Sequence, residues 1–125
     1  MREILNSYKQ SIERLIEILG QEKTVANRDS TIKRFEFTVE LAWKSAQEFL
    51  RDQEIICRSP KECLKEIFKF GLIEDNPKWL LMFEDRNLTV HTYDEKTADE
   101  VYLRVSDYLP ILNQLKDSLN KFNES

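Results

Sequence analysis

The chain has few of the residues that interrupt helices, and it has no long apolar segment. Only two of its 125 residues are Gly and three are Pro, while 34% are charged. This composition is typical of a helical protein with short loops rather than of a sheet or a disordered chain. The longest apolar run covers residues 79–83, which is far too short to span a bilayer, so we expect no membrane association.

The sequence also has little that indicates export, a disulfide framework or a bound metal. An acid stands at Glu3 and no apolar signal region follows it. Cys57 and Cys63 do not form a CxxC pair, and we expect both to be reduced thiols of a cytoplasmic protein. A single His and the absence of an acidic cluster at ligand spacing predict no metal site. No Gly-rich phosphate loop is present, and we expect no cofactor.

Charge is distributed unevenly along the chain. The net charge of −4 gives no general attraction to nucleic acid. Residues 28–69 contain nine basic and eight acidic side chains, whereas residues 70–100 contain three basic and eight acidic ones. Any nucleotide that binds within the second segment therefore needs local, directed contacts.

Apolar residues recur at spacings of three and four in the first half of the chain, which predicts helices. The first helix has its apolar face at Leu5, Tyr8, Ile12, Leu15 and Leu19, and it should end at Gly20. Asp29 and Ser30 offer an N-cap for the second helix. The face of that helix consists of Ile32, Phe35, Val39, Ala42, Ala46 and Phe49.

Three further helices follow from capping signals. The sequence 59–62, Ser-Pro-Lys-Glu, is a capping box for a short helix that should stop at Gly71. Asn76-Pro77 starts a fourth helix, and the capping box at 97–100 opens a long fifth one that Pro110 should kink or divide. The sequence therefore predicts one all-α domain over residues 1–125. We expect an antiparallel up-and-down four-helix bundle with an additional short helix, five helices in all.

The fourth helix carries an anomaly in its apolar face. That face consists of Trp79, Phe83, Arg86, Val90 and Tyr93, so a guanidinium takes a place where the pattern requires an apolar residue. Burying an unpaired guanidinium costs several kcal/mol. We therefore expect this end of the helix to face a partner, a ligand or a solvent cleft. The alternatives are an arginine that reaches solvent at the helix end, or one that pairs with an acid on another helix.

The only histidine of the chain, His91, lies in the same segment. At roughly 100° per residue, Asn87 and His91 share one helix face, while Arg86 and His91 are about 140° apart. One ideal helix cannot direct both side chains at one atom. Either the helix is distorted near its end, or a second copy of the chain completes the site. A two-fold dimer with this helix at its interface would place two arginines and two histidines around one cleft.

The segment from Arg86 to His91 resembles the Rx4–6H signature of the HEPN superfamily, and with Tyr93 it is similar to the RX4HXY form of HepT-type proteins. Further blocks resemble the subfamily called nucleotidyltransferase substrate-binding proteins. They are Arg34-Phe35-Glu36-Phe37, Leu41-Ala42-Trp43-Lys44, Ser59-Pro60, Gly71-Leu72-Ile73, residues 84–89 and His91-Thr92-Tyr93-Asp94-Glu95. The resemblance covers residues 28–108.

The resemblance implies the toxin of a toxin–antitoxin pair whose partner is a minimal nucleotidyltransferase, and the helix geometry leads us to expect that it acts as a homodimer. It implies a metal-independent endoribonuclease in which Arg86 and His91 are catalytic and Asn87 orients the histidine or the substrate. Tyr93 would accept AMP from the transferase, which neutralises the toxin. The alternative within the same family is a non-catalytic subunit that binds the substrate or nucleotide of the transferase.

The chemistry agrees with these roles only if two chains cooperate. Metal-free RNA cleavage needs a base, an acid and positive charge on the phosphate, and one chain supplies only one imidazole. Trp43, which could stack a base, and the adjacent Lys44 are candidate substrate contacts, although aromatic residues at helical spacing more often belong to a core. A third hypothesis is a structural dimer in which Arg86 pairs with Glu84, Asp85 or Asp94 of the other chain.

Overall fold

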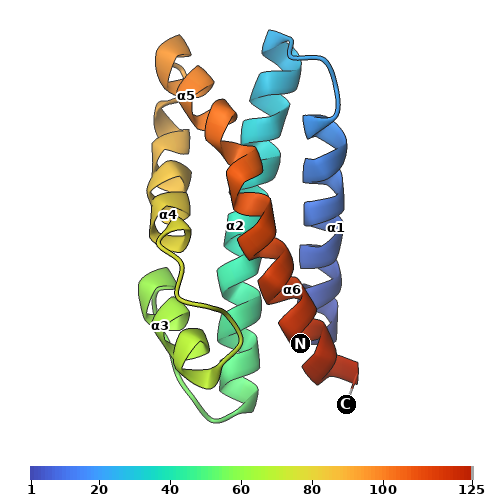
Figure 1. The fold of residues 1–125 in the computed structure, drawn as a ribbon, viewed down its shortest axis with the longest axis vertical. Coiled ribbons are helices and arrows are strands. Elements are labelled where there is room, and N and C mark those ends of the chain that lie inside the picture. The colour runs from blue at the N-terminus through green and yellow to red at the C-terminus, as the bar shows by residue number, and fades with distance from the viewer. Residues whose placement is uncertain (125) are drawn as a thin grey trace.

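Short turns join six α-helices over residues 1–124, the part of the chain that the computed structural model describes. The elements are α1 (Arg2–Leu19), α2 (Val25–Asp52), α3 (Pro60–Phe70), α4 (Lys78–Leu88), α5 (Glu95–Val105) and α6 (Leu109–Glu124), with one-turn 3₁₀ helices η1 (Thr89–His91) and η2 (Ser106–Tyr108). Along the long axis α1, α2, α4 and the α5–α6 pair alternate in direction, and both termini lie at one end (Figure 1). The predicted all-α bundle with an additional short helix is confirmed.

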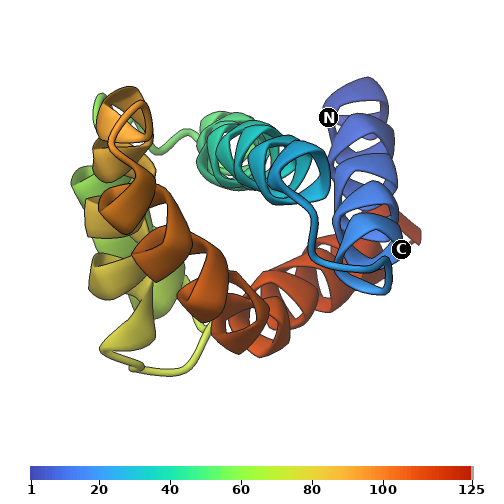
Figure 2. The same ribbon diagram turned by 90° about the horizontal axis from the view of Figure 1, so that it is seen from above.

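Helix α2 is the central element of the bundle. It contacts α1, α3, α4, α5 and α6. Viewed from above, it lies between α1 on one side and α3 and α4 on the other, with α6 across a third side (Figure 2). Its predicted apolar face is buried throughout, and the small side chains of Ala42 and Ala46 have no exposed surface. Small residues let neighbouring helices approach closely, which explains how one helix can contact five others.

The outer helices cover this core with the apolar faces expected from the sequence. On α1, the side chains of Leu5, Tyr8, Ile12 and Leu15 are buried. The Tyr8 hydroxyl donates a 2.6 Å hydrogen bond to the Leu112 carbonyl oxygen, which fixes α1 to α6. Burial also raises the pKa of Tyr8 well above its ordinary value.

No helix within residues 1–124 is both long and apolar enough to cross a membrane.

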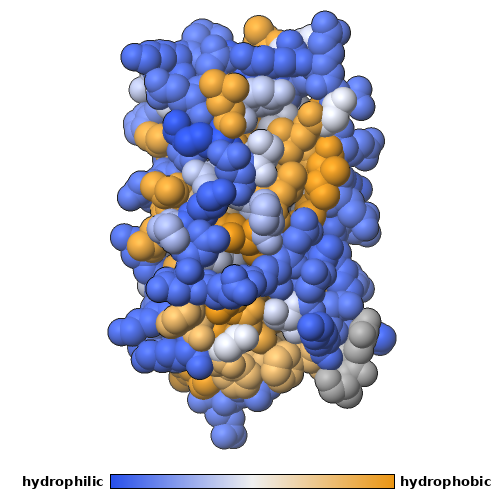
Figure 3. Space-filling view, in the orientation of Figure 1, coloured by the Kyte–Doolittle hydropathy of each residue, from blue (hydrophilic) through white to orange (hydrophobic). Residues whose placement is uncertain are grey.

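The surface of the face shown in Figure 1 is mostly hydrophilic, and hydrophobic side chains appear there only in separate patches (Figure 3). Most of the apolar residues that recur at spacings of three and four along each helix are buried, and the polar residues between them form most of the surface. On the final pair of helices Val101, Val105, Leu112, Leu115 and Leu119 are buried. Pro110 divides this pair as predicted, because it stands at the second position of α6, directly after the η2 turn.

Two helix starts differ from the prediction. Helix α2 begins at Val25 and not near Asp29, because the Thr24 hydroxyl accepts a 3.0 Å bond from the Asn27 amide. Helix α5 begins at Glu95, with Asp94 as its N-cap. The Asp94 carboxylate accepts bonds from the amide and hydroxyl of Thr97, the residue expected to be the cap. In both cases an earlier polar residue provides the cap.

The start and end of α3 agree with the prediction. The Ser59 hydroxyl accepts a 3.2 Å bond from the Glu62 amide, and Pro60 is the first helical residue. The helix ends at Gly71, which has a left-handed φ of 92°. Only Gly adopts such a φ without strain, so the stop signal has a direct backbone cause.

The expectation of reduced cysteines is wrong in this structure. A disulfide joins Cys57, in the loop after α2, to Cys63 on α3, and both residues are buried. The chain reverses between these helices, which brings the two Cα atoms to 5.1 Å from each other. Spacing along the sequence did not indicate this approach.

We expect the Gly71→Ala variant to unfold with a free energy about 1 kcal/mol lower than that of the wild type, because Ala resists a positive φ. The added methyl group would meet no atom within 4 Å at this position, so the loss of stability would come from backbone strain and not from a clash. The matched control is Gly20→Ala, where φ is −79° and the nearest contact is 3.5 Å. Urea denaturation should separate the two variants, and equal midpoints would contradict this account of Gly71.

Candidate functional site

A buried carboxylate lies immediately before the anomalous arginine of α4. Asp85 is 5% exposed, and its two oxygens accept bonds of 2.9 and 2.7 Å from the Arg104 guanidinium. The Tyr108 hydroxyl also donates to Asp85. The pKa of Tyr108 is raised mainly by burial and, second, by this hydrogen bond to Asp85. The network connects α4 to α5 and η2, and so it fixes the rotation of α4 that directs the next side chain.

The Arg86 side chain is 29% exposed and lies on the wall of a cleft. This cleft has a volume of about 470 Å³ and runs between α2, α4 and the start of α3. Its lining includes Trp43, Lys61, Phe83 and Asn87 in addition to Arg86. The expectation that this end of α4 faces a solvent cleft is therefore confirmed. The cleft combines a cation, an amide and an indole ring, which are suited to a phosphate and a base.

Glu40 of α2 is the acid with which Arg86 pairs, at 3.6 Å. Its carboxylate also lies 3.5 Å from the Lys44 ammonium and accepts a 3.3 Å bond from the Trp43 indole N–H. The pairing with an acid on another helix was one of the alternatives for Arg86, and the structure supports it. The long distance and partial exposure make this a weak ion pair that an anionic ligand can displace.

The regular helix ends two residues after Arg86. The Arg86 carbonyl oxygen accepts bonds from the amide and the hydroxyl of Thr89, the latter at 2.6 Å. The chain then tightens into η1, and the Thr92 hydroxyl donates to the Thr89 carbonyl oxygen at 3.0 Å. The distortion considered from the sequence is therefore present. Its cause is that two threonine hydroxyls bond to carbonyl groups of the last turns.

His91 and Tyr93 lie on this turn, and both are exposed, Tyr93 by 82%. Their rings meet edge to face at 6.0 Å, and the Tyr93 hydroxyl lies 3.5 Å from the His91 Nδ1. No hydrogen bond or ring contact joins His91 to Arg86 in the described chain, and His91 does not line the Arg86 cleft. The structure thus divides the predicted residues into two groups, with Arg86, Asn87 and Trp43 in one and His91 and Tyr93 in the other.

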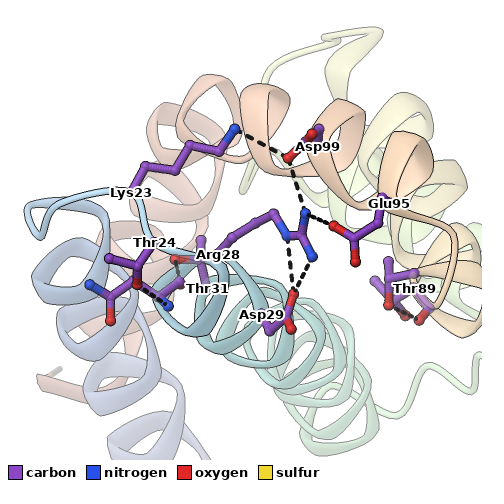
Figure 4. Close-up of polar contacts among 10 residues, drawn as sticks. Lys23, Thr24, Arg28, Asp29, Thr31, Thr89, Glu95 and Asp99 are labelled. Atoms are coloured by element: carbon purple, nitrogen blue, oxygen red, sulfur yellow. Dashed lines mark hydrogen bonds and ion pairs between the residues drawn. The ribbon is translucent and has the colours of Figure 1, made fainter.

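A second ionic network anchors the start of α5, which follows this turn directly in the chain (Figure 4). The Arg28 side chain, 4% exposed, donates to Glu95 at 2.6 Å and to Asp99 at 3.2 Å, and it also bonds to Asp29. The bond from Arg28 lowers the pKa of Glu95, and bonds from Lys23 and then Arg28 lower the pKa of Asp99. This network joins the first turn of α2 to the first turn of α5, directly after the His91 segment.

Glu40 is the site residue that the sequence did not reveal. It lies three and four positions before Trp43 and Lys44, but nothing in the sequence indicates which helix packs against α4. Lys44 is exposed and lines a different cleft, on the α1 side of α2. No group of three or more His, Cys, Asp or Glu side chains within residues 1–124 is arranged to hold a metal ion.

A family model described as "nucleotidyltransferase substrate binding protein like" matches residues 3–121 of the chain. A curated Haemophilus influenzae protein named probable ribonuclease HepT is 35% identical over 98 residues. That alignment covers 74% of this chain and 67% of the relative.

Two solved structures have the same fold. A protein of Thermus thermophilus is 34% identical with a TM-score of 0.82, and the match covers 90% of this chain and 98% of that one. A second, from Haemophilus influenzae, is described as revealing the fold of a substrate binding domain of a nucleotidyltransferase. It is 27% identical, also has a TM-score of 0.82, and the match covers 93% of this chain and 98% of that one.

We expect an Arg28→Met variant to have a lower Tm than the wild type at pH 7, with a difference that shrinks below about pH 4. The pKa values of Glu95 and Asp99 are lowered in the folded chain. Their contribution to stability is therefore complete above the unfolded pKa and is lost as the pH falls through the folded pKa. Calorimetry across pH 2–8 measures the difference.

The control for this variant is Lys78→Met, which removes an exposed cation of α4. Its effect on Tm should be small at every pH. A deficit of Arg28→Met that stays constant down to pH 2 would show that packing, and not the ion pairs, is responsible.

Proposed function

This chain belongs to the family of nucleotidyltransferase substrate binding protein-like proteins, and on that premise we propose that it is the helical partner of a nucleotidyltransferase and a metal-independent endoribonuclease. The ribonuclease name of the Haemophilus influenzae relative supports the activity, and the description of the solved homologue supports the partner. The observation that carries the proposal is the Arg86 guanidinium on a cleft wall, followed by an exposed His91.

The reaction is a transesterification within the RNA. An imidazole of His91 takes the proton of a ribose 2′-hydroxyl, and the 2′-oxygen attacks the adjacent phosphorus. The bond to the 5′-oxygen breaks, and an imidazolium returns a proton to that oxygen. The products are a 2′,3′-cyclic phosphate and a 5′-hydroxyl end. Arg86 binds the non-bridging oxygens and stabilises the charge that develops on them.

The proposed active form is a homodimer. One chain holds a single imidazole, and that imidazole makes no contact with the Arg86 of its own chain among the described residues. A two-fold interface formed around the ends of α4 would supply one histidine as the base and the other as the acid. Val90 and Leu88, which are 64% and 37% exposed beside the motif, provide apolar surface for such an interface. Asn87 then orients the ribose or the imidazole.

Tyr93 is the proposed site at which the transferase controls this activity. The hydroxyl oxygen attacks the α-phosphorus of ATP and releases its proton to solvent, the bond to pyrophosphate breaks and pyrophosphate leaves, and AMP becomes esterified to the phenol. Tyr93 is 82% exposed, whereas Tyr8 and Tyr108 are at most 3% exposed and cannot reach an enzyme. Its ring contacts His91, so the added nucleotide would block access to the catalytic imidazole. The pair would thus act as toxin and antitoxin.

A specific observation favours a second candidate, a non-catalytic nucleotide-binding subunit. The Arg86 cleft offers an indole ring, an amide and two cations in one chain, without any second copy. Its volume of about 470 Å³ lies within the range of small-ligand sites. Titration of the purified protein with ATP and AMP in a calorimeter tests it. Nucleotide binding that Arg86→Ala abolishes, in a protein that does not cleave RNA, would favour this candidate over the first.

We expect His91→Ala to reduce cleavage of single-stranded RNA by about 10²–10⁴-fold, the usual contribution of a general acid or base. Arg86→Ala should cause a similar loss, because it removes the phosphate contact. Both variants should relieve the growth arrest that expression without the transferase causes. Arg51→Ala, which removes an exposed cation at the end of α2, is the control and should retain full activity. Wild-type protein that leaves RNA intact and does not arrest growth excludes the ribonuclease proposal.

Intact-protein mass spectrometry after incubation with the transferase and ATP tests the proposed modification. We expect the wild-type chain to gain the mass of AMP, and Tyr93→Phe to gain none. Tyr102→Phe, which removes a half-exposed phenol elsewhere on α5, should be modified like the wild type. Adducts that persist in Tyr93→Phe would assign the acceptor to another residue.

A further inference from the structure

A second cleft lies on the α1 side of α2, next to the Arg86 cleft. It has a volume of about 420 Å³ and runs between α1 and α2. Its lining includes Arg14 of α1 and Arg34, Phe37, Glu40 and Lys44 of α2. Glu40 lines both clefts, and its carboxylate contacts Lys44 on one side and Arg86 on the other. The two clefts therefore meet at this residue.

The second cleft concentrates positive charge on a chain whose net charge is −4. Its lining contains three cations, Arg14, Arg34 and Lys44, and one acid, Glu40. Glu40 already pairs with Lys44 and Arg86. Arg14 and Arg34 form no ion pair within the described part of the chain. They also line a third hollow that continues along α1 and α2 toward Gln21, where Glu17 is the one acid. Unpaired guanidinium groups in a concave surface are the electrostatic signature of a polyanion site.

An exposed aromatic ring lies among these cations. Phe37 is 46% exposed, and the Lys33 ammonium lies 5.2 Å from the centre of its ring. Phe37 and Lys44 are seven residues apart on α2, so they share one face of the helix, with Glu40 between them. A ring surrounded by cations is the arrangement on which the bases of single-stranded nucleic acid stack. An acidic peptide would use the cations but would have no need of the ring.

We propose that the cleft between α1 and α2 binds the backbone of single-stranded RNA and guides it over Glu40 to the Arg86 cleft. Arg14, Arg34 and Lys44 hold successive phosphates, and a base stacks on Phe37. This inference rests on the proposed ribonuclease function, because that function makes the Arg86 cleft the place to which the bound strand leads. Duplex RNA is disfavoured, because its bases are already stacked and cannot reach the ring.

The test uses a fluorescein-labelled oligouridylate and the His91→Ala protein, which binds without cutting. The triple variant Arg14→Gln, Arg34→Gln, Lys44→Gln should weaken binding by at least tenfold at low salt. It should also reduce the slope of log K against log salt by about two, the value for three lost contacts to a single strand. The control is the triple variant Arg51→Gln, Lys65→Gln, Lys69→Gln, which changes the net charge equally and should bind like the parent.

Phe37→Leu tests the stacking contact separately. We expect it to weaken oligouridylate binding by about tenfold with an unchanged salt slope, because no charge is lost. Phe68→Leu is the matched control, since Phe68 is also 46% exposed but lies on α3, outside the cleft. Circular dichroism of each variant confirms that the bundle is intact.

Cleavage assays with an active His91 separate this inference from the proposed function. The double variant Arg14→Gln, Arg34→Gln, which leaves the Lys44–Glu40–Arg86 contacts in place, should raise KM for a long single strand more than it changes the cleavage of a dinucleotide. If variants of the cleft between α1 and α2 bind and cleave long RNA like the wild type, the RNA track is overturned but the proposed ribonuclease function is not. A protein that never cuts RNA, yet binds oligouridylate through these residues, would retain the track and remove the ribonuclease. Loss of the transferase complex without loss of RNA binding would make the cleft a protein-docking surface and overturn the inference.

Discussion

The buried carboxylate of Asp85 determines how α4 lies in the bundle. A charge taken out of water must be paired, and among residues 1–124 its side-chain partners are Arg104 of α5 and Tyr108 of η2. Because the partners are on α5 and η2, α4 cannot rotate or slide without leaving this charge unsatisfied. The next residue is Arg86, so the direction of the guanidinium follows from the pairing of its neighbour. The cleft beside α2 depends on this constraint.

The site has two parts that a single chain keeps separate. The cation and the amide lie on α4, in a cleft closed by α2 and the start of α3. The imidazole and the phenol lie on the turn after α4, exposed to solvent, and the Arg28 network anchors the helix that follows them. The proposed two-chain chemistry would make use of this separation, because the exposed part of one chain would have to reach the cleft of another. It also leaves the Tyr93 phenol exposed, as the proposed modification would require.

Most of the fold could be predicted from local signals. The spacing of apolar residues located the buried faces of α1, α2 and the final helices, Ser59 and Gly71 marked the limits of α3, and Pro110 marked the division of α5 from α6. The starts of α2 and α5 were wrong by several residues, since Thr24 and Asp94 cap earlier than the first obvious candidates. The disulfide was missed because it depends on how a loop folds back.

In the site, the polar environment of Arg86 could be predicted from the break in an apolar face. Its partner Glu40 could not, because the contact joins residues 46 positions apart on helices whose packing the sequence does not specify.

The single carboxylate shared by Arg86, Lys44 and Trp43 acts as a permanent internal competitor for any anion that enters the cleft. A monovalent ion such as chloride offers no more charge than the group it must displace, and it has no oxygen acceptors. A phosphate diester that is one of a series, held at several points along a strand, overcomes that competitor through its neighbours. If the proposed RNA track is correct, Glu40 would keep Arg86 paired in the presence of separate small ions and would give it up only to a linked series of phosphates.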